Sequence, residues 1–328
     1  MDTLFTLIEP LQSFLFQQVV LPLLYGTGFM SYAEDGYTAT GYFLLGILQI
    51  ALAYALLRPL EIWRPAEHWT DRRLVRADVM YTWLRRSGAL PLLLFILLRP
   101  LLIPLDQALR GAGYLPPNLE RLAPGVTNQP LFALMVYLVV IDFFEYWRHR
   151  LQHRFAWWWA LHGTHHSQRQ VSLWTDDRNH LLDSLIESLW FALLALVIGI
   201  PPAQFIAAVL TTNFVESLAH ANVRLSFGPI GNRMLVSPSY HRVHHAIGLG
   251  HEGPARGCNF ATLFPAWDSL FGTAEYRPLY LPTGVRDQLA GADYGTGFWS
   301  QQVTGVRRLL QTITDSRSST SRRPSTSE

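Results

Sequence analysis

The sequence predicts an all-α integral membrane protein built as a helical bundle, and three observations lead to this fold class. Charged residues make up only 15% of the 328-residue chain and hydrophobic residues 49%, whereas soluble domains typically contain roughly 25% charged residues. The mean hydropathy is +0.14. Several apolar runs approach the length of about 20 residues that a helix needs to cross a bilayer.

The basic residues argue against a nucleic-acid-binding protein. All 26 of them are arginines and the formal net charge is only +2. The arginines gather beside the apolar runs and do not follow one helix face. The single cysteine, Cys258, excludes an internal disulfide and a metal cluster held by cysteines alone. We expect Cys258 to be a small, partly buried residue.

Four apolar runs are predicted to be membrane helices, with a polar connection, Met30 to Thr40, between the first two. They are Leu11 to Phe29, Gly41 to Trp63, Gly88 to Leu105, and Pro130 to about His153. Arg99 and two prolines leave it open whether the third run kinks or lies partly in the interface. The first residues do not have the pattern of a signal peptide.

The arginine distribution predicts the orientation of a multi-pass protein. The connection from Arg64 to Arg86 holds six arginines, a concentration that marks cytoplasmic loops. Counting spans alternately from this loop places the end of the fourth helix in the cytoplasm as well. Trp157 to Trp159 follows and is predicted to anchor the chain at headgroup depth, with a substrate entrance as the alternative role.

The second half of the chain contains two shorter apolar arms, Leu181 to Ile200 and Ala203 to Leu218. A proline pair between them forces a break, so we predict a helical hairpin that dips into the membrane and returns. The last ordered part is predicted to run from Asn259 to about Tyr280. The Ser/Arg-rich stretch from Ser316 to Glu328 is predicted to be a disordered tail.

All histidines except His68 lie between His149 and His251, and eight of them form three spaced groups. The groups are His149 and His153; His162, His165 and His166; and His241, His244 and His245. Residues three and four apart share a helix face, so each group can aim its imidazoles at one point. Eight candidate ligands exceed the four of a tetrahedral zinc site, so the sequence predicts two metal ions.

The identity of the metal leaves three function classes to weigh. Four or five nitrogen ligands per ion leave room for oxygen and suit iron, while the Glu-x-x-His motif of ferritin-like di-iron proteins is absent. A zinc-dependent membrane hydrolase is the first alternative. A non-enzymatic metal-binding or transport protein is the second, but transport sites lie near the bilayer midplane and these histidines flank the spans.

The three groups resemble the histidine boxes of the fatty acid hydroxylase and sterol desaturase superfamily of membrane di-iron oxygenases. The boxes read His149-Arg-Leu-Gln-His153, His162-Gly-Thr-His-His166 and His241-Arg-Val-His-His245. The flanking sequences are similar to the family as well: the stretch from Asp142 to the first box, and the stretch from Phe260 to Thr273 after the last. The resemblance covers about Asp142 to Thr273.

The resemblance implies a cytosol-facing helical cap that holds two irons over a lipid-accessible cleft. It divides the chain into N-terminal transmembrane helices (1–129), a di-iron catalytic domain (130–280) and a C-terminal extension (281–328). It also implies nine metal ligands and no further catalytic residues. The ligands are His149, His153, His162, His165, His166, His220, His241, His244 and His245.

The reaction implied by the resemblance is an O2-dependent hydroxylation or desaturation of a lipid such as a sterol or a fatty acyl chain. Two iron ions are the implied cofactors, with zinc as a substitute in purified protein. Electrons come from a separate donor of cytochrome b5 or ferredoxin type, because the sequence has no signature of a fused one. No nucleic acid is involved.

Several neighbouring residues have two readings each. Relatives place another histidine where this chain has Arg224, so Asn222, water or His180 is left to complete one metal site. His180 lies in a segment resembling Arg-x-His-Pro-x-Glu of relatives, and we expect it to orient a ligand or cap a helix.

Two acidic residues precede the first box. Asp142 is predicted to orient a ligating imidazole through its other ring nitrogen. Glu145 does the same or pairs with Arg148 or Arg150. His68 and His251 are predicted to be structural or solvated and not ligands.

Overall fold

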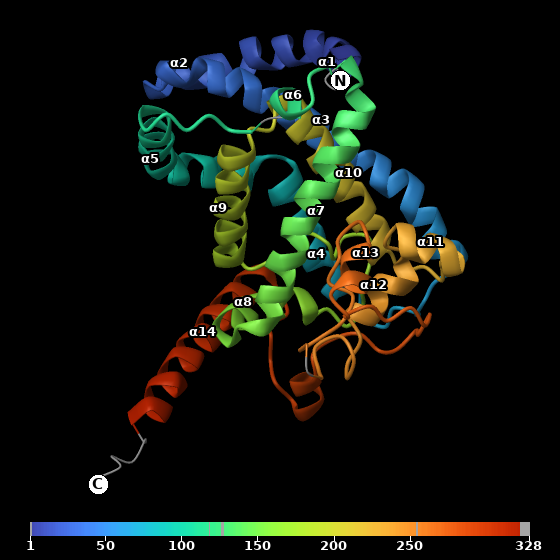
Figure 1. Cartoon of the computed structure of the whole chain (residues 1–328). Coiled ribbons are helices and arrows are strands. Elements are labelled where there is room, and N and C mark those ends of the chain that lie inside the picture. The colour runs from blue at the N-terminus through green and yellow to red at the C-terminus, as the bar shows by residue number, and fades with distance from the viewer. Residues whose placement is uncertain (1, 118, 126–127, 254, 322–328) are drawn as a thin grey trace. The chain divides into compact units, whose positions relative to one another are not determined.

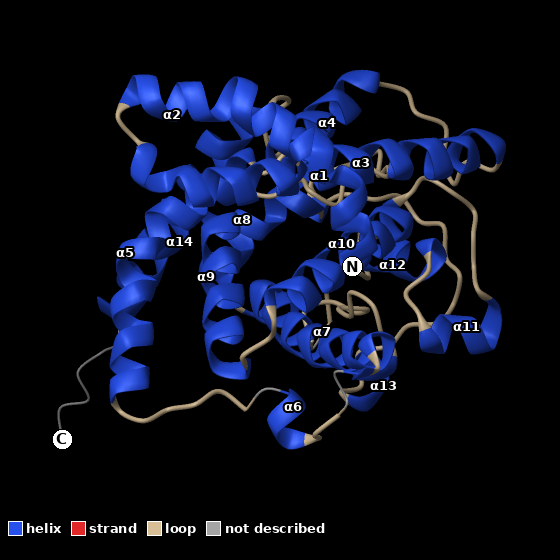
Figure 2. Ribbon diagram, turned by 90° about the horizontal axis from the view of Figure 1, so that it is seen from above, coloured by secondary structure: helices blue, strands red, loops and turns tan. Residues whose placement is uncertain are grey.

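The computed structural model describes residues 2–117, 119–125, 128–253 and 255–321, without the side chains of 2–5, 120 and 316–321. These residues form helices and loops and no strand, and one isolated bridge joins Ala246 to Thr283 (Figure 2). The predicted all-α class is therefore confirmed.

The described chain forms two compact units, each assembled from separated segments. The first unit comprises Met1–Leu56, Thr82–Tyr137 and Glu187–Phe214. The second comprises Leu57–Tyr81, Leu138–Ile186 and Val215–Glu328. Five helices contribute residues to both units, so the units do not follow the chain in order. The domain boundaries at 129 and 280 stay predictions.

The first unit consists largely of helices (Figure 1), most of them apolar. It contains α1 (Asp2–Leu15), the π-helical turn η1 (Phe16–Val20), α2 (Leu21–Thr27), the 3₁₀ turn η2 (Met30–Tyr32), most of α3 (Ala33–Trp63), α5 (Ala89–Gly111) and α6 (Leu119–Leu122). It also takes parts of α4 (Arg72–Arg86), α7 (Pro130–Arg154), α9 (Leu181–Ile198) and α10 (Pro202–His220).

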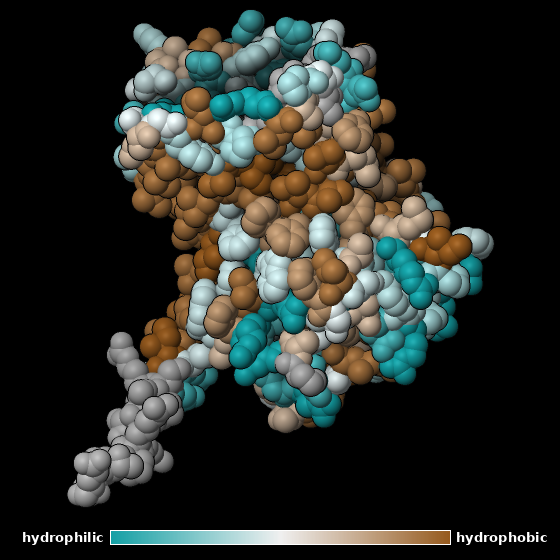
Figure 3. All heavy atoms as spheres, viewed as in Figure 1, coloured by the Kyte–Doolittle hydropathy of each residue, from teal (hydrophilic) through white to brown (hydrophobic). Residues whose placement is uncertain are grey.

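Many large apolar side chains of this unit face outward, including Leu93, Ile96, Leu97 and Leu101 of α5. The apolar surface appears brown in Figure 3. Exposing such an apolar surface to water is unfavourable, whereas contact with lipid is not. By length and composition five helices qualify as membrane spans: Thr6–Thr27, Met30–Trp63, Ala89–Gly111, Pro130–Arg154 and Leu181–Ile198.

These candidate spans include the four predicted ones and correct their limits. The second begins in helix at Ala33, so the predicted connection from Met30 to Thr40 is wrong over most of its length. Glu34 and Asp35 lie in the first turn of α3, where negative charge stabilises the positive end of the helix dipole. Asp35 also accepts a hydrogen bond from Arg99 at 3.1 Å, which gives the arginine of the third span a partner.

The predicted break between the two shorter arms is confirmed. Helix α9 ends at Ile198, Gly199 follows with φ 68°, and α10 begins at Pro202. Helix α9 is long and apolar enough to qualify as a span, although its 18 residues were expected to form only one arm of a hairpin. The entry of this pair into the membrane and its return stay predictions.

The second unit contains the shorter helices and most of the buried polar residues. Its helices are α8 (Ala156–His166), α11 (Gly228–Met234), α12 (Pro238–His244), α13 (Ala266–Leu270), the 3₁₀ turn η4 (Arg286–Ala290) and α14 (Phe298–Ser321). A fully buried cluster of Tyr146, Val236, Tyr240 and Phe260 forms its apolar core.

Helix α14 was missed by the sequence analysis. It packs against α8 (Figure 1), so the predicted end of ordered structure near Tyr280 is wrong. Gln302 of α14 accepts the N–H of Leu181 at 2.7 Å and donates to the Tyr81 hydroxyl at 2.9 Å. The helix continues to Ser321, so the predicted tail is wrong for residues 316–321, because an existing helix gains a hydrogen bond with each added residue. Residues 322–328 lie outside the described residues.

Candidate metal centre

The second unit brings all nine predicted ligand histidines together, and each of them is buried. They come from four helices that are distant in the sequence. Helix α7 supplies His149 and His153; α8 supplies His162, His165 and His166; α10 ends at His220; and α12 supplies His241 and His244, with His245 directly after it.

Local sequence explains why the short helices carry these histidines in their last turns. Helix α12 begins with Pro238, whose missing N–H costs nothing at a helix start, and the Ser237 side chain accepts the N–H of Tyr240. A hydroxyl at this position satisfies one of the unpaired donors of the first turn. The helix is two turns long, so His241 and His244 fall on its final turn and His245 caps its end.

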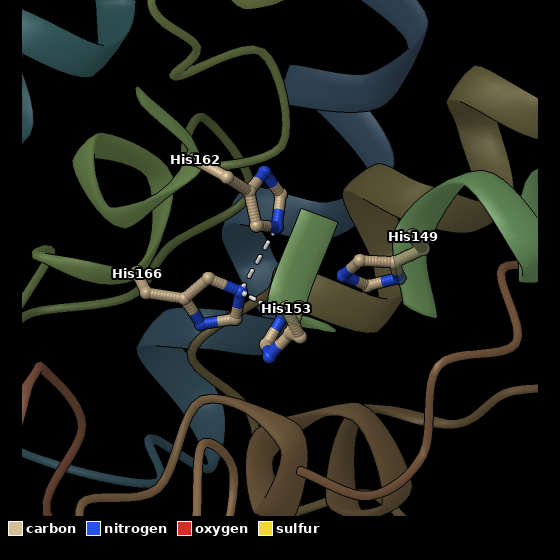
Figure 4. Close-up of side chains that lie close together, drawn as sticks. All are labelled: His149, His153, His162 and His166. Atoms are coloured by element: carbon tan, nitrogen blue, oxygen red, sulfur yellow. Dashed lines mark hydrogen bonds between the residues drawn. The ribbon is translucent and has the colours of Figure 1, made fainter. Parts of the chain in front are cut away.

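A first four-histidine group comprises His149, His153, His162 and His166. One ring nitrogen of each lies within 4.8 Å of those of the others. The Nε2 atom of His166 is 3.1 Å from Nε2 of His153 and 3.2 Å from Nε2 of His162. Figure 4 shows these rings turned toward one another.

A second four-histidine group comprises His165, His220, His241 and His245. The Nε2 atom of His220 lies 2.9 Å from Nε2 of His241, 3.1 Å from that of His245 and 3.3 Å from that of His165. Asn222, the alternative ligand, is occupied elsewhere, because its side chain exchanges hydrogen bonds with the backbone of Glu67.

His244 lies in neither group of four but joins them. Its ring nitrogen and those of His166 and His245 all lie within 4.8 Å of one another. His166 belongs to the first group and His245 to the second. The nine imidazoles therefore form one continuous nitrogen-lined cluster with two centres.

Backbone carbonyls fix the tautomers of five rings. The Nδ1 atoms of these rings donate to carbonyl oxygens at 2.7–3.2 Å. The pairs are His149 with Phe260, His153 with Arg256, His165 with Arg178, His220 with Glu216, and His244 with Cys258. A carbonyl oxygen can only accept, so in each neutral ring Nδ1 carries the proton and Nε2 offers a lone pair.

His165 and His220 show that a cation fits this donor set. Both rings have Nδ1 occupied by a carbonyl, and their Nε2 atoms lie 3.3 Å apart. Two facing lone pairs repel, and neutral rings in these tautomers form no hydrogen bond with each other. A metal ion among the rings would accept both lone pairs, and neutral imidazole suits iron, zinc, copper and nickel.

The electrostatics keep these rings in the ligating form. Burial, together with the neighbouring imidazoles, holds the pKa of His165, His166, His241, His244 and His245 well below the usual value of 6.5. Rings with such pKa values are neutral near pH 7, and neutral imidazole is the form that binds metal.

Asp183 is the acidic partner that the sequence analysis missed. Its carboxylate accepts from His162 Nδ1 at 3.3 Å, from Gln152 Nε2 at 3.0 Å and from Trp158 Nε1 at 2.7 Å. A carboxylate in this place fixes the orientation and the tautomer of the imidazole. The sequence signal that could have identified it is its position at the end of the segment from Arg178 to Asp183, which resembles Arg-x-His-Pro-x-Glu of relatives.

Asp142 was expected in that role, and this prediction is wrong. Its two carboxylate oxygens accept the backbone N–H groups of Leu263 and Phe264 at 2.8 and 2.9 Å. Asp142 lies on the same helix stripe as the histidines, but its carboxylate binds backbone N–H groups of the loop after Phe260 and not an imidazole. Glu145 forms the ion pair with Arg148 that was one of its two readings.

His180 caps a helix, which was one of its predicted roles. Its Nδ1 accepts the N–H of Leu182 at 3.1 Å in the first turn of α9, and its Nε2 donates to the Gln302 carbonyl at 2.8 Å. His68 is exposed, as predicted. His251 is partly buried beside His166, with ring centroids 4.5 Å apart, and its Nε2 donates to the Gly284 carbonyl.

The tryptophan run is only partly described by the predicted interfacial role. Trp157 is 41% exposed, but Trp158 is buried against Asp183. The ring centroid of Trp159 lies 4.8 Å from that of His153. The prediction of an interfacial anchor is therefore wrong for Trp158 and Trp159, because the helical twist of α8 turns these two inward. Cys258 is partly buried, as predicted.

Comparisons with known proteins point to the same part of the chain. Residues 134–273 match the family model described as fatty acid hydroxylase. The chain is 34% identical to alkylglycerol monooxygenase of Homo sapiens over 138 residues, which is 41% of this chain and 29% of that protein. It is 30% identical to ornithine lipid hydroxylase of Rhizobium tropici over 161 residues, 48% of this chain and 47% of that protein.

A third relative extends the chemistry. The chain is 24% identical to Delta(7)-sterol 5(6)-desaturase of Gibberella zeae over 182 residues, 56% of this chain and 47% of that protein. The chain thus spans less than half the length of these curated relatives. No solved structure matches it.

Proposed function

Because residues 134–273 match the family model described as fatty acid hydroxylase, we propose that this protein is a membrane-bound oxidoreductase, an O2-dependent di-iron oxygenase that acts on a lipid. The proposed reaction is hydroxylation of a C–H bond, since the relatives that match at 30% identity or more are named as monooxygenase and hydroxylase. Desaturation is the variant that a more distant relative suggests.

The observation that carries this proposal is the buried cluster of nine histidines with its two four-nitrogen centres. In the proposal all nine are metal ligands: His149, His153, His162, His165, His166, His220, His241, His244 and His245. Two iron ions bound there would supply O2 activation, which no side chain provides by itself. Zinc can take the same nitrogen ligands.

The roles of the chain's own residues follow from their contacts. The carbonyls that bind Nδ1 of five rings keep Nε2 directed at the centre, and Asp183 does this for His162. The protein thus pre-orients its ligands, so little rearrangement opposes metal binding. Burial of all nine rings excludes bulk water, which protects reactive species from side reactions.

The substrate class and partners are argued from chemistry and from the relatives. The outward apolar surface of the first unit and its candidate spans suit a substrate that reaches the enzyme through the bilayer. The proposed electron donor is a separate protein of cytochrome b5 or ferredoxin type. The arginine-rich stretch from Arg64 to Arg86 supports a cytoplasmic position of the site.

One experiment tests the proposal directly. The protein, purified in detergent and loaded with iron, is incubated with O2, a reducing system and separate pools of sterols, fatty acyl lipids, ether lipids and ornithine lipids. We expect O2 uptake coupled to one lipid product heavier by one oxygen, with 18O2 labelling that oxygen. Protein that binds two irons but oxidises none of these lipids would contradict the proposed activity.

The zinc-hydrolase alternative predicts a different outcome. Zinc-loaded protein would then cleave a lipid ester or amide without O2, and iron would add nothing. Comparing iron-loaded with zinc-loaded protein on the same lipids separates the two functions, because only the oxygenase needs O2.

A further inference from the structure

The two four-histidine groups are held differently on their outer side. The first group has a carboxylate in direct contact, since Asp183 accepts from His162 Nδ1. In the second group, the Nδ1 atoms of His165 and His220 donate to backbone carbonyls. A backbone carbonyl is only as well placed as the loop that carries it, so the loop around Arg178 decides where the ring of His165 points.

That loop joins α8 to α9 without helical structure of its own from Gln168 to Asn179. Its position is fixed by a carboxylate from an earlier helix, Asp78 of α4, whose exposed fraction is 0%. Asp78 accepts from Gln168 Nε2 at 2.6 Å and from the Thr175 hydroxyl at 2.9 Å. It also accepts from Arg178 Nη1 at 2.8 Å. One buried carboxylate thus holds three points along the loop.

Arg178 passes this constraint to the histidines. Arg178 is buried, with an exposed fraction of 2% for the whole residue. Its guanidinium donates from Nε to the Thr164 carbonyl at 2.8 Å and from Nη2 to the Ser167 hydroxyl at 3.0 Å. Both acceptors lie at the end of α8, beside His165. The main-chain carbonyl of Arg178 accepts His165 Nδ1 at 3.2 Å. Arg178 therefore holds both the helix end that carries His165 and the outer edge of its ring.

The planar guanidinium explains why an arginine stands here. Its five donors lie in a rigid fork, so one side chain can bind Asp78, Thr164 and Ser167 at once in a fixed geometry. A buried guanidinium is tolerated only when it is paired and hydrogen-bonded. Asp78 supplies that charge, so the position of Arg178 depends on Asp78.

We propose that Asp78, acting through Arg178, is a positioning residue for the second four-histidine group, whereas Asp183 orients the first. Each metal centre then has its own buried carboxylate, and Asp78 lies outside the 134–273 segment that matches the family. The inference rests on the proposed function only in requiring two metal ions at the histidines. It does not depend on what reaction they support.

The test uses metal affinity, and Co2+ is the probe because its visible absorption reports nitrogen ligation. Full-length protein in detergent is titrated with Co2+, and bound metal is counted by mass spectrometry. Wild type is expected to bind two ions. Asp78→Asn, which keeps shape and removes charge, should weaken one of the two sites by about 10- to 100-fold, as loss of a partner behind a ligand does. Asp71→Asn, an exposed carboxylate beside the same helix, is the matched control and should bind as wild type does.

Combined variants identify which site is affected. Adding Asp78→Asn to His162→Ala should weaken binding of the one remaining ion by the same factor of about 10 to 100, because that ion occupies the second group. Adding it to His165→Ala should change the remaining affinity less than twofold. Asp183→Asn should give the reverse pattern. A different effect of Asp78→Asn in the two histidine backgrounds indicates positioning of one centre, because a general loss of stability would weaken metal binding in both backgrounds alike.

Three results would overturn the inference. One is Asp78→Asn protein that binds both ions with wild-type affinity, and another is equal weakening in the two histidine backgrounds. If Asp78→Asn does not fold, as judged by helical circular dichroism, Arg178→Lys replaces it, because lysine keeps the charge but loses the forked donors of the guanidinium. The third overturning result is that neither variant folds, which would assign the Asp78–Arg178 pair to folding alone. Wild-type protein that binds two Co2+ ions but, loaded with iron, oxidises no lipid would reject the proposed function and leave this result intact.

Discussion

The two four-histidine groups are built from the same side chain but not from the same surroundings. In the first, His149 and His153 are backed by carbonyls of the segment from Arg256 to Phe260, and His162 is backed by a carboxylate. In the second, His165 and His220 donate from Nδ1 to carbonyls, and the nearest carboxylate oxygen to His220 Nδ1, from Asp176, lies farther away at 4.0 Å. A ligand imidazole backed by a carboxylate is more basic than one backed by a carbonyl.

This difference teaches that nine equal ligands do not make two equal centres. The imidazole–carboxylate distance is 3.3 Å in the first group, between His162 and Asp183, and 4.0 Å in the second, between His220 and Asp176. We expect the first centre to favour the more oxidised metal and the second to exchange ligands more readily. The following changes break or sharpen that contrast.

Replacing one ligand in each group tests whether both centres are required. His162→Ala and His165→Ala should each reduce turnover by more than about 100-fold, beyond the loss caused by removing a partner behind a ligand. Each variant should retain one metal ion and normal membrane insertion. Turnover is measured by lipid product formation, and full activity of either variant would mean that its group is not part of the active centre.

Trp158→Phe tests the carboxylate of the first group alone. The change removes the indole N–H that Asp183 accepts at 2.7 Å, and a hydrogen bond to a charged group is worth about 1.5–3 kcal/mol. We expect a loss of stability of that size and weaker metal binding at the first centre only. Trp157→Phe, at an exposed neighbour, is the control; an identical loss in both variants would point to aromatic packing instead.

Asp142→Ala separates loop support from ligand support. It leaves the N–H groups of Leu263 and Phe264 without their acceptor, and an unsatisfied buried donor costs about 1–3 kcal/mol. Thermal unfolding in detergent should occur at lower temperature, while the affinities of both centres stay within a factor of a few. Selective loss of one ion would restore the role first predicted for Asp142.

Removing residues after Ser316 should have the smallest effect. The contacts of α14 that reach Tyr81, His180 and Leu181 come from Gln302, well before the cut. Lipid product formation and metal content should match the full chain within error. A loss of either would show that the end of α14 has contacts beyond those of its first turns.

The histidine spacing was enough to predict that the eight histidines of the three groups gather, because steps of three and four on a helix place rings on one face. His220, the ninth, was predicted only by the resemblance to the family. The same periodicity misled for Asp142, which shares the stripe of His149 and His153. Spacing fixes the direction of a side chain but not its partner. The partner of Asp142 is a backbone segment more than a hundred residues later, which no local pattern encodes.

The apolar runs predicted the spans, but their ends were wrong wherever polar residues continue a helix, as at Glu34 and Asp35. Helix α14 was missed for a related reason. After Phe298 at its start, its buried residues are Gln301, Gln302 and Gly305, which carry no hydrophobic signal. A Cβ atom at Gly305 would lie 2.3 Å from His180, so close approach and amide hydrogen bonds hold this helix, and composition alone does not reveal either.

The backbone oxygens that hold Nδ1 of five rings have one more consequence. His165 and His244, whose pKa values are lowered by burial, carry their single ring proton on the side turned away from the cluster, so an arriving ion meets nitrogens that are already bare. Metal uptake near neutral pH should therefore release no protons from these side chains, and the heat of loading should be the same in buffers of different ionisation enthalpy. The metal affinity would then vary little with pH until the pH is low enough for protons to compete with the metal for those nitrogens.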